Sequence, residues 1–153
     1  MSKDVLVFKS MADASNVLPH ITAARAIKAG ASFVLSYNTT SMTGIATSTV
    51  YDIEHLIMAH IHAGNATSQG GVVYPLFTYL PSISVPRHSK VVFSTMFGTA
   101  DLNPAQLMLA ANATASAIST AFVAALQSAN LYVNYHTTAY PAGEVRGQVK
   151  PHM

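Results

Sequence analysis

The sequence predicts a mostly β protein whose antiparallel strands enclose one core. Short apolar runs separated by turn residues recur along the chain, which is typical of sheets joined by hairpins. Apolar and polar side chains alternate within these runs, so that Phe33, Leu35 and Tyr37 share one side of an extended segment. A helical pattern is confined to one region before the last strands. We therefore expect a sheet protein with one or two short helices.

The apolar runs place the strands in chain order. They cover residues 5–9, 31–37, 45–51, 56–62, 72–80, 91–97, 131–136 and 145–149. Residues 38–44 form the turn of a hairpin between the second and third strands. Pro75 and Pro81 cannot donate hydrogen bonds to a neighbouring strand, so the strand at residues 72–80 is expected to be short or to lie at an edge of the sheet.

Two short helices are expected before the last strands. Asn103 is a good N-cap and Pro104 suits the first helical position. This helix should end near residues 112–116. A second helix then spaces Ile118, Phe122 and Leu126 four residues apart, which gives it an apolar stripe that packs on the strands or seals one end of them.

Length and composition favour a single domain over residues 1–153. Only 9% of the residues are charged, whereas about 25% is usual for soluble domains. The surface must therefore rely on uncharged polar side chains. Such surfaces are common in extracellular proteins, and also in chains that cover part of their surface in a homo-oligomer or against a protein partner.

Charge and hydropathy exclude two classes of partner. The eight Lys and Arg residues are scattered, which argues against nucleic acid. No apolar stretch approaches the ~18 residues of a membrane-spanning helix. Glycosylation sequons at Asn38, Asn65 and Asn112 favour a secreted origin. We expect a secreted, periplasmic or extracellular protein, whose leader would be absent from this chain because Met1 leads directly into a strand.

Three histidines form the candidate metal site. Successive side chains of a strand alternate faces, so His60 and His62 share the face opposite Ile61. The same alternation sends His136 outward from the strand at residues 131–136. We expect all three imidazoles on the outer wall of the sheet, open to solvent. The glycine-rich loop at residues 63–71 could fold back over this face.

Imidazole nitrogens suit copper and zinc, and the absence of cysteine removes the thiolates of closed structural zinc sites and blue copper centres. Copper is the sharper hypothesis and zinc the alternative. Glu144 and Arg146 fall on the outer face of the last strand, where they could converge with the histidines. A histidine pair with this spacing can also be solvated surface or a local hydrogen-bonding device.

The motifs around these histidines resemble the CHRD (chordin-type) domain family. The resemblance is carried by Met58-Ala59-His60-Ile61-His62-Ala63-Gly64 and by the long stretch from Leu131 to Val149, which includes Tyr132-Val133-Asn134-Tyr135-His136 and Pro141-Ala142-Gly143-Glu144-Val145-Arg146-Gly147-Gln148. Upstream, Ala14-Ser15-Asn16-Val17-Leu18-Pro19 and Gly30-Ala31-Ser32-Phe33 resemble the opening of the family's domain. The resemblance spans nearly the whole chain.

This resemblance implies a Greek-key β-barrel or sandwich of about eight strands, related to copper-zinc superoxide dismutases. It implies that His60, His62 and His136 hold copper, and that Arg146 attracts a small anion such as superoxide. The chain lacks the cysteine pair and the zinc-binding cluster of those enzymes. His88 could supply a fourth ligand, although an exposed loop histidine is the plainer interpretation. Glu144 could complete the metal site, orient an imidazole, or pair with Arg146.

Two functions remain open at this point. The first is a copper-binding domain with redox activity on superoxide or another small oxidant, which would make the chain a superoxide dismutase-like copper oxidoreductase. The second is a non-catalytic extracellular module that binds another protein, in which the His, Glu and Arg cluster only braces the strands. His20, His55 and His152 have no motif support for either function.

Overall fold

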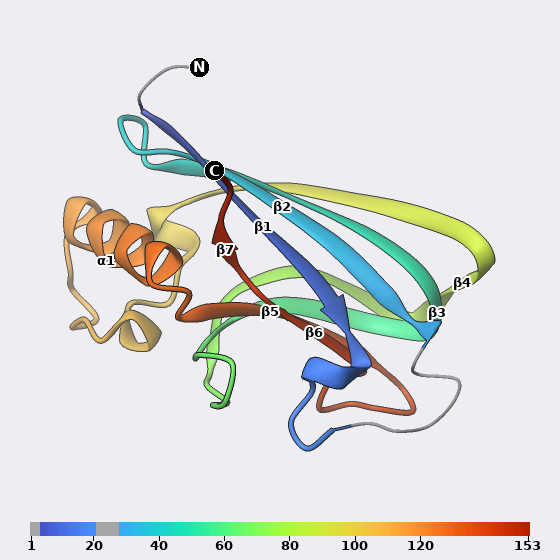
Figure 1. Ribbon diagram of the computed structural model, residues 1–153. Helices are drawn as coiled ribbons and strands as arrows, with labels where there is room; N and C mark the ends of the chain where they lie inside the picture. Colours follow the sequence, from blue (N-terminus) through green and yellow to red (C-terminus); the bar gives the residue numbers. More distant parts are fainter. Residues whose placement is uncertain (1–3, 21–27) are drawn as a thin grey trace.

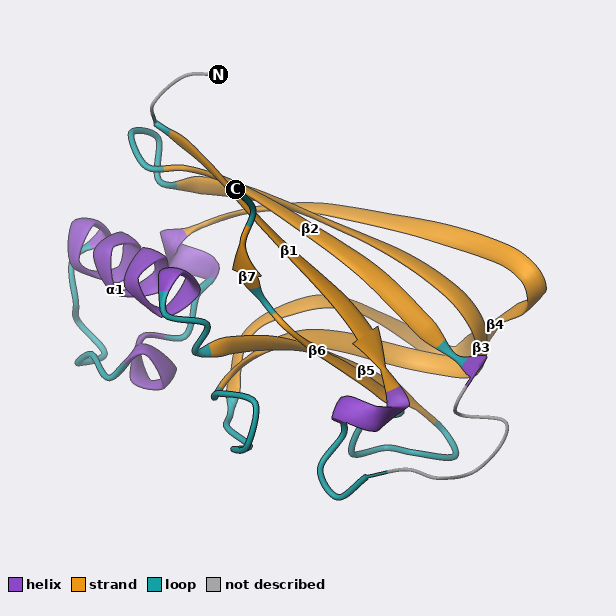
Figure 2. Ribbon diagram, viewed as in Figure 1, coloured by secondary structure: helices purple, strands orange, loops and turns teal. Residues whose placement is uncertain are grey.

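A computed structural model describes residues 4–20 and 28–153 (Figure 1). Its strands are β1 (Val5–Asp13), β2 (Gly30–Asn38), β3 (Thr43–Ala63), β4 (Val72–Gly98), β5 (Leu131–Thr137), β6 (Val145–Gln148) and β7 (Lys150–Pro151). One α-helix, α1 (Ala115–Gln127), and the short 3-10 helices η1 (Ala14–Asn16), η3 (Thr99–Asp101) and η4 (Pro104–Leu107) complete the described elements. Figure 2 shows that strands make up most of the molecule, as predicted.

Five of the strands close into an antiparallel barrel. The sheet runs in the order β2-β1-β6-β5-β3, and β3 pairs again with β2, so that these strands form a ring. Two strands lie outside the ring: β4 pairs with β3, and β7 pairs with β1. The position of β4 agrees with the prediction from Pro75 and Pro81, because a proline that cannot donate is tolerated on an outer strand.

The predicted set of about eight separate strands is corrected to a seven-stranded sheet. Two predicted strands merge into β3, and two others merge into β4. The register between β3 and β4 shifts several times from Tyr51 to Met58, and Asp52 and His55 adopt positive φ angles there. Such bulges bend a strand without ending it. The first half of β3 can therefore pair with β2 and its second half with β5.

The barrel core contains the side chains that the alternation predicted. Phe33, Leu35 and Tyr37 are no more than 1% exposed. The stripe of α1 is also confirmed, since Ile118, Phe122 and Leu126 are buried in the same core cluster. The Phe122 ring meets Tyr37 edge-on at a centroid distance of 5.3 Å. The helix therefore covers one end of the barrel, as Figure 1 shows.

The first predicted helix is only one 3-10 turn long. Asn103 caps it as expected, because its side chain accepts a hydrogen bond from the amide of Ala105. The turn ends at Met108, which adopts a left-handed conformation with φ of 61°. The second helix begins later, after the N-cap Thr114. No helix in residues 4–20 and 28–153 has the length and apolar character needed to cross a bilayer.

Candidate metal centre

The candidate site lies on the outer side of the barrel where β3 and β5 pair. His60 is opposite Asn134 in the register of these strands, and His136 is opposite Met58. Ile61 is fully buried in the core, so the neighbouring His60 and His62 point away from it. The predicted orientation of the histidine pair is therefore confirmed.

The geometry brings one ring nitrogen from each histidine into a single group. These nitrogens of His60, His62 and His136 all lie within 4.8 Å of one another. Nδ1 of His60 is 3.2 Å from Nε2 of His136. Two nitrogens bound to one zinc-like ion at ~2.0–2.1 Å in tetrahedral geometry are about 3.3 Å apart. This pair already has the separation that a shared ion requires.

Two of the imidazoles are oriented by backbone carbonyl groups. Nδ1 of His62 lies 2.9 Å from the carbonyl oxygen of Gly70, and Nδ1 of His136 lies 2.9 Å from that of Pro141. A carbonyl can only accept, so both Nδ1 atoms carry the proton and both Nε2 atoms carry a lone pair. Protein metal sites commonly fix histidine ligands in this way.

The Nε2 atom of His62 is buried and has no hydrogen-bond partner in the described part of the chain. A buried polar atom without a partner costs free energy, which makes such atoms uncommon. A metal ion bound by His62 together with His60 and His136 would satisfy it. The residues present therefore fit a three-nitrogen metal site.

The electrostatics of the site keep the imidazoles neutral. Burial and the neighbouring His136 and His62 lower the pKa of His60 to about 4. Burial also lowers the pKa of His62, helped by the nearby charge of Arg146. The pKa of His136 is lowered by burial and by His62. Neutral imidazoles keep the lone pairs that bind metal, so these three are ready to act as ligands at neutral pH.

The expectation of an open, solvent-exposed site is corrected. His62 is only 9% exposed and His136 only 6%. The loop after β3 reaches His62 through the Gly70 carbonyl, as the glycines at residues 63–71 suggested, and the turn after β5 reaches His136 through the Pro141 carbonyl. A Cβ atom on Gly70 would collide with the carbonyl oxygen of Ala63, so the close approach of this loop requires glycine. His60 is the least buried of the three histidines.

Arg146 fastens this covering loop to the barrel. Its Nη2 atom donates to the carbonyl oxygens of Asn65 at 2.6 Å and Ser68 at 2.7 Å. The guanidinium also lies over the ring of Tyr132, 3.5 Å from its centroid. Arg146 is 3% exposed, and burial lowers its pKa. The Arg146 side chain thus points outward from its strand, as predicted, but the loop covers it and separates it from solvent.

Glu144 and His88 lie outside the group of three ligand nitrogens. The Glu144 carboxylate is fully buried and accepts a hydrogen bond of 2.6 Å from the hydroxyl of Thr137. His88 is exposed, with φ of 65°, in the bent part of β4. His20, His55 and His152 are likewise exposed. The structure brings together the three histidines of the motif and none of the other histidines it describes.

Sequence reasoning missed the role of Tyr132. Its ring stacks on His62 with a centroid distance of 5.1 Å and an interplanar angle of 10°, so that His62, Tyr132 and Arg146 form one stack. The alternation of residues 131–136 does place Tyr132 on the same outward face as His136. No sequence pattern could have indicated the roles of the Gly70 and Pro141 carbonyl groups, because every residue has a backbone carbonyl.

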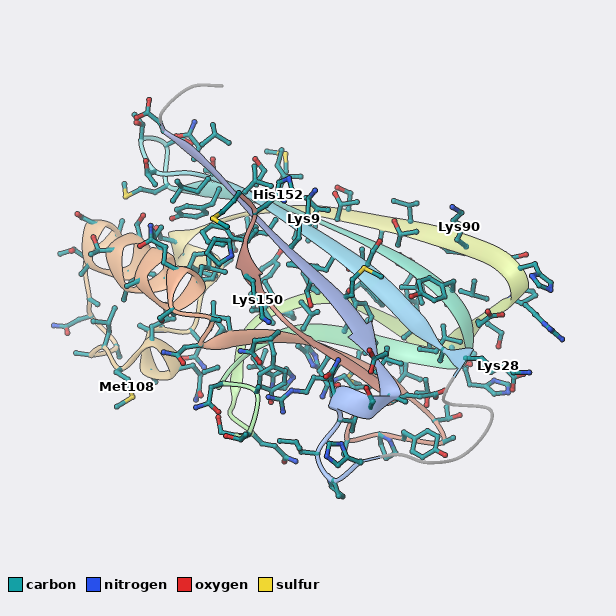
Figure 3. All side chains as sticks on the ribbon, in the orientation of Figure 1. Lys9, Lys28, Lys90, Met108, Lys150 and His152 are labelled. Atoms are coloured by element: carbon teal, nitrogen blue, oxygen red, sulfur yellow. The ribbon has the colours of Figure 1, made fainter. Side chains whose placement is uncertain are left out.

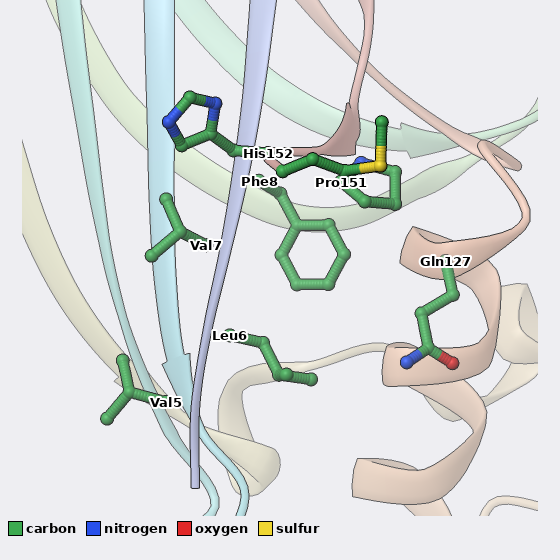
Figure 4. Close-up of a pocket in the computed structure, with 8 residues that line it drawn as sticks. Val5, Leu6, Val7, Phe8, Gln127, Pro151 and His152 are labelled. Carbon is green, nitrogen blue, oxygen red and sulfur yellow. The ribbon is translucent and has the colours of Figure 1, made fainter. Parts of the chain in front are cut away.

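A cavity of about 100 Å³ lies beside His62, lined by Val17, Leu18, His62, Gln69, Gly70, Tyr132, Asn134, Ala142 and Arg146. Larger hollows lie elsewhere. The groove between β1, β7 and the end of α1 is about 460 Å³ and is lined mainly by apolar side chains such as Leu6, Phe8 and Pro151 (Figure 4). This groove holds none of the three clustered histidines, whereas the smaller cavity is lined by His62.

Comparison with known proteins identifies the family. The CHRD domain model matches residues 8–149, which is nearly the whole described chain and includes all three histidines. The chain therefore belongs to the CHRD domain family, as the motifs predicted. Searches of curated proteins and of solved structures found no significant match.

Proposed function

We propose that this CHRD domain binds one transition-metal ion, copper in the first place and zinc as the alternative, through His60, His62 and His136. The observation that carries the proposal is the buried, unpartnered Nε2 atom of His62 beside two further imidazole nitrogens. Three neutral nitrogen donors without a thiolate suit copper and zinc better than magnesium or calcium, which prefer oxygen ligands.

We further propose redox activity of this site toward superoxide or another small oxidant. When bound, copper would supply a one-electron redox couple. Three histidine ligands leave a coordination position free, and the cavity of about 100 Å³ beside His62 limits access to small molecules. The likeness to copper-zinc superoxide dismutase rests on the His-x-His pair, on the later strand histidine His136 and on the place of Arg146 in the sequence. A secreted or periplasmic location is part of the same proposal, supported by the low content of charged residues and by the exposed side chains of Asn65 and Asn112.

The chain's own residues would position the ligands and limit access. Gly70 and Pro141 fix two imidazoles through their carbonyl groups, and Arg146 holds the loop that carries Gly70. Attraction of a small anion by Arg146 stays a prediction. It is supported by the position of Arg146 in the wall of the same cavity as His62.

A second candidate is a protein-binding module in which the histidines only brace the strands. It is supported by the direct contact between His60 and His136, which joins β3 to β5 without any ion. The two candidates differ in what happens when metal is supplied. A brace needs no metal, whereas a ligand set should bind one equivalent tightly.

The test is the electron paramagnetic resonance spectrum of the protein with one equivalent of copper(II). We expect one well-defined signal with nitrogen splittings, which the His60→Ala/His62→Ala variant loses. The matched control is His20→Ala/His88→Ala, which removes two exposed histidines outside the group and should leave the signal unchanged. Heterogeneous copper that responds equally to both variants would refute the metal site and favour the brace.

A further inference from the structure

The sheet formed by β1, β2, the first half of β3 and the second half of β4 has a bare outer face. Its register aligns four rows of side chains across the strands: Val7–Ser36–Ile45–Met96, Lys9–Val34–Thr47–Ser94, Met11–Ser32–Thr49–Val92 and Asp13–Gly30–Tyr51–Lys90. The residues between these rows, such as Phe8 and Leu35, are buried in the barrel. The rows therefore point outward. We call this surface the outer face.

The outer face gathers most of the exposed apolar side chains of the described chain. Large hydrophobic residues are exposed at eight described positions, and five of these positions lie on the outer face: Met11 (62%), Val34 (37%), Ile45 (47%), Val92 (61%) and Met96 (73%). Ile45 and Met96 are direct neighbours across β3 and β4. Clustering of this kind is typical of interaction surfaces, whereas single exposed apolar residues are not.

The charges of the outer face lie only at its two edges. Asp13 and Lys9 are on β1, and Lys90 is on the opposite edge strand, β4; Figure 3 labels the two lysines. Between these edges the four rows carry hydroxyl and apolar side chains. The ring of Tyr51 lies across the face above Gly30, where a Cβ atom would meet it at 2.5 Å. Exposed apolar side chains on all four strands, with Tyr51, Asp13 and Lys90 together in the last row, provide residue types that protein interfaces use.

We propose that the outer face packs against the outer face of a second copy of this chain, around a two-fold axis parallel to the strands. This axis places each row over the same row of the second copy. Within a row, the β1 residue of one copy faces the β4 residue of the other. Asp13 then lies opposite Lys90 of the second copy, and Met11 lies opposite Val92 of the second copy. Val7 and Met96 meet in the same way. One symmetry operation thus pairs Asp13 with Lys90 and sets two pairs of apolar residues opposite each other, while Lys9 lies opposite Ser94.

The size of the outer face is sufficient for this assembly. Four strands spaced ~4.8 Å apart, over the seven residues that the rows span at ~3.4 Å each, cover a footprint of about 460 Å². The accessible area of a side-chain surface exceeds its flat footprint, so the outer face reaches the lower range of specific interfaces, about 600 Å² per partner. The net charge of +2 opposes self-association only weakly. A two-fold contact also closes on itself and leaves no surface for further growth.

The first test is the molecular mass in solution, measured by light scattering or sedimentation over a range of concentrations. We expect a dimer of two 16.2 kDa chains. Val92→Lys should weaken dimerisation at least tenfold because it places a charge in the apolar contact opposite Met11 of the second copy, where it must lose its hydration. Leu80→Lys is the matched control, because Leu80 is 84% exposed but lies in no row of the outer face. The Leu80→Lys variant should therefore remain a dimer. Circular dichroism confirms that both variants fold.

The second test probes the axis itself and uses the absence of cysteine in the chain. Met11→Cys and Val92→Cys are made separately and treated with a short bis-maleimide that reaches across the ~10 Å between packed sheets. The mixture of the two variants should give a cross-linked dimer, and each variant alone should not. A monomeric wild type, a dimer that resists Val92→Lys, or cross-linking of a single variant with itself would each overturn the proposal.

Discussion

Nδ1 of His60 lies 3.2 Å from Nε2 of His136, although the two residues are 76 positions apart in the chain. The antiparallel pairing of β3 with β5 creates this contact, because it sets His60 opposite Asn134 and places His136 two residues further along the same face. His62 completes the group from the strand that carries His60. The site therefore depends on the pairing of β3 with β5 and on the Gly70 carbonyl, which holds the imidazole of His62 in place.

Substitution of Gly70 should weaken metal binding without touching a ligand. The Cβ atom of Gly70→Ala would collide with the carbonyl oxygen of Ala63, so the loop must move and His62 must lose its hydrogen bond to the Gly70 carbonyl. Loss of such a supporting contact typically reduces metal affinity 10–100-fold. Competition titration with a copper chelator measures the change. Gly98→Ala, where a Cβ atom meets nothing within 4 Å, should bind copper like the wild type.

Removal of the Arg146 guanidinium should destabilise the protein. Arg146→Met loses two hydrogen bonds to loop carbonyls and the contact with Tyr132. Hydrogen bonds from a charged donor contribute about 1.5–3 kcal/mol each, so the loss of two should lower the free energy of unfolding by about 3–6 kcal/mol. Denaturant titration of the metal-free protein measures it. Arg87→Met is the control, since Arg87 is exposed; equal effects of the two variants would contradict the role of Arg146.

The metal-free protein should lose stability as the pH falls from about 6.5 toward 4. In the unfolded chain His60 takes up a proton near its ordinary pKa of 6.5, whereas in the folded protein its pKa is about 4. Between these values the unfolded state binds more protons, so acidification favours unfolding. The lowered pKa values of His62 and His136 act in the same direction.

Thermal melts of the metal-free protein at pH 7.5, 6.0 and 5.0 measure this dependence on pH. In a His60→Gln variant the fall in melting temperature over this range should be smaller, because one of the titrating groups is gone. A wild-type protein whose stability rises on acidification would show that the histidines are not held neutral in the folded state.

Loss of the Phe122 ring should destabilise the end of the barrel. Phe122 is fully buried and contacts Tyr37 and Phe97 edge-on. Substitution of a buried Phe by Ala costs about 3–5 kcal/mol, from lost apolar burial and from the cavity left behind. We therefore expect Phe122→Ala to lower the unfolding midpoint in urea strongly. Met108→Ala, at a residue that is 93% exposed, should change stability by less than about 0.5 kcal/mol.

Much of the architecture could be predicted because it depends on local patterns. Alternation along residues 31–37 identified the core side chains Phe33, Leu35 and Tyr37, and a four-residue spacing identified the buried stripe of α1. The continuity of β3 could not be predicted in the same way. Asp52 and His55 look like turn residues, yet pairing with β2 on one side and β5 on the other carries the strand through them.

The sequence by itself determined which imidazoles share a face, because the two-residue period of a strand is a property of the backbone and needs no partner. It also determined the family, through motifs between Ala14 and Val149, and the match of the family model to residues 8–149 confirmed it. Only the tertiary structure decided that the site is covered. The carbonyl groups of Gly70 and Pro141 that orient His62 and His136, and the loop that Arg146 fastens, come from segments whose approach depends on chain closure and packing. Backbone carbonyls are the same in every residue, so no sequence pattern records which of them will reach a histidine.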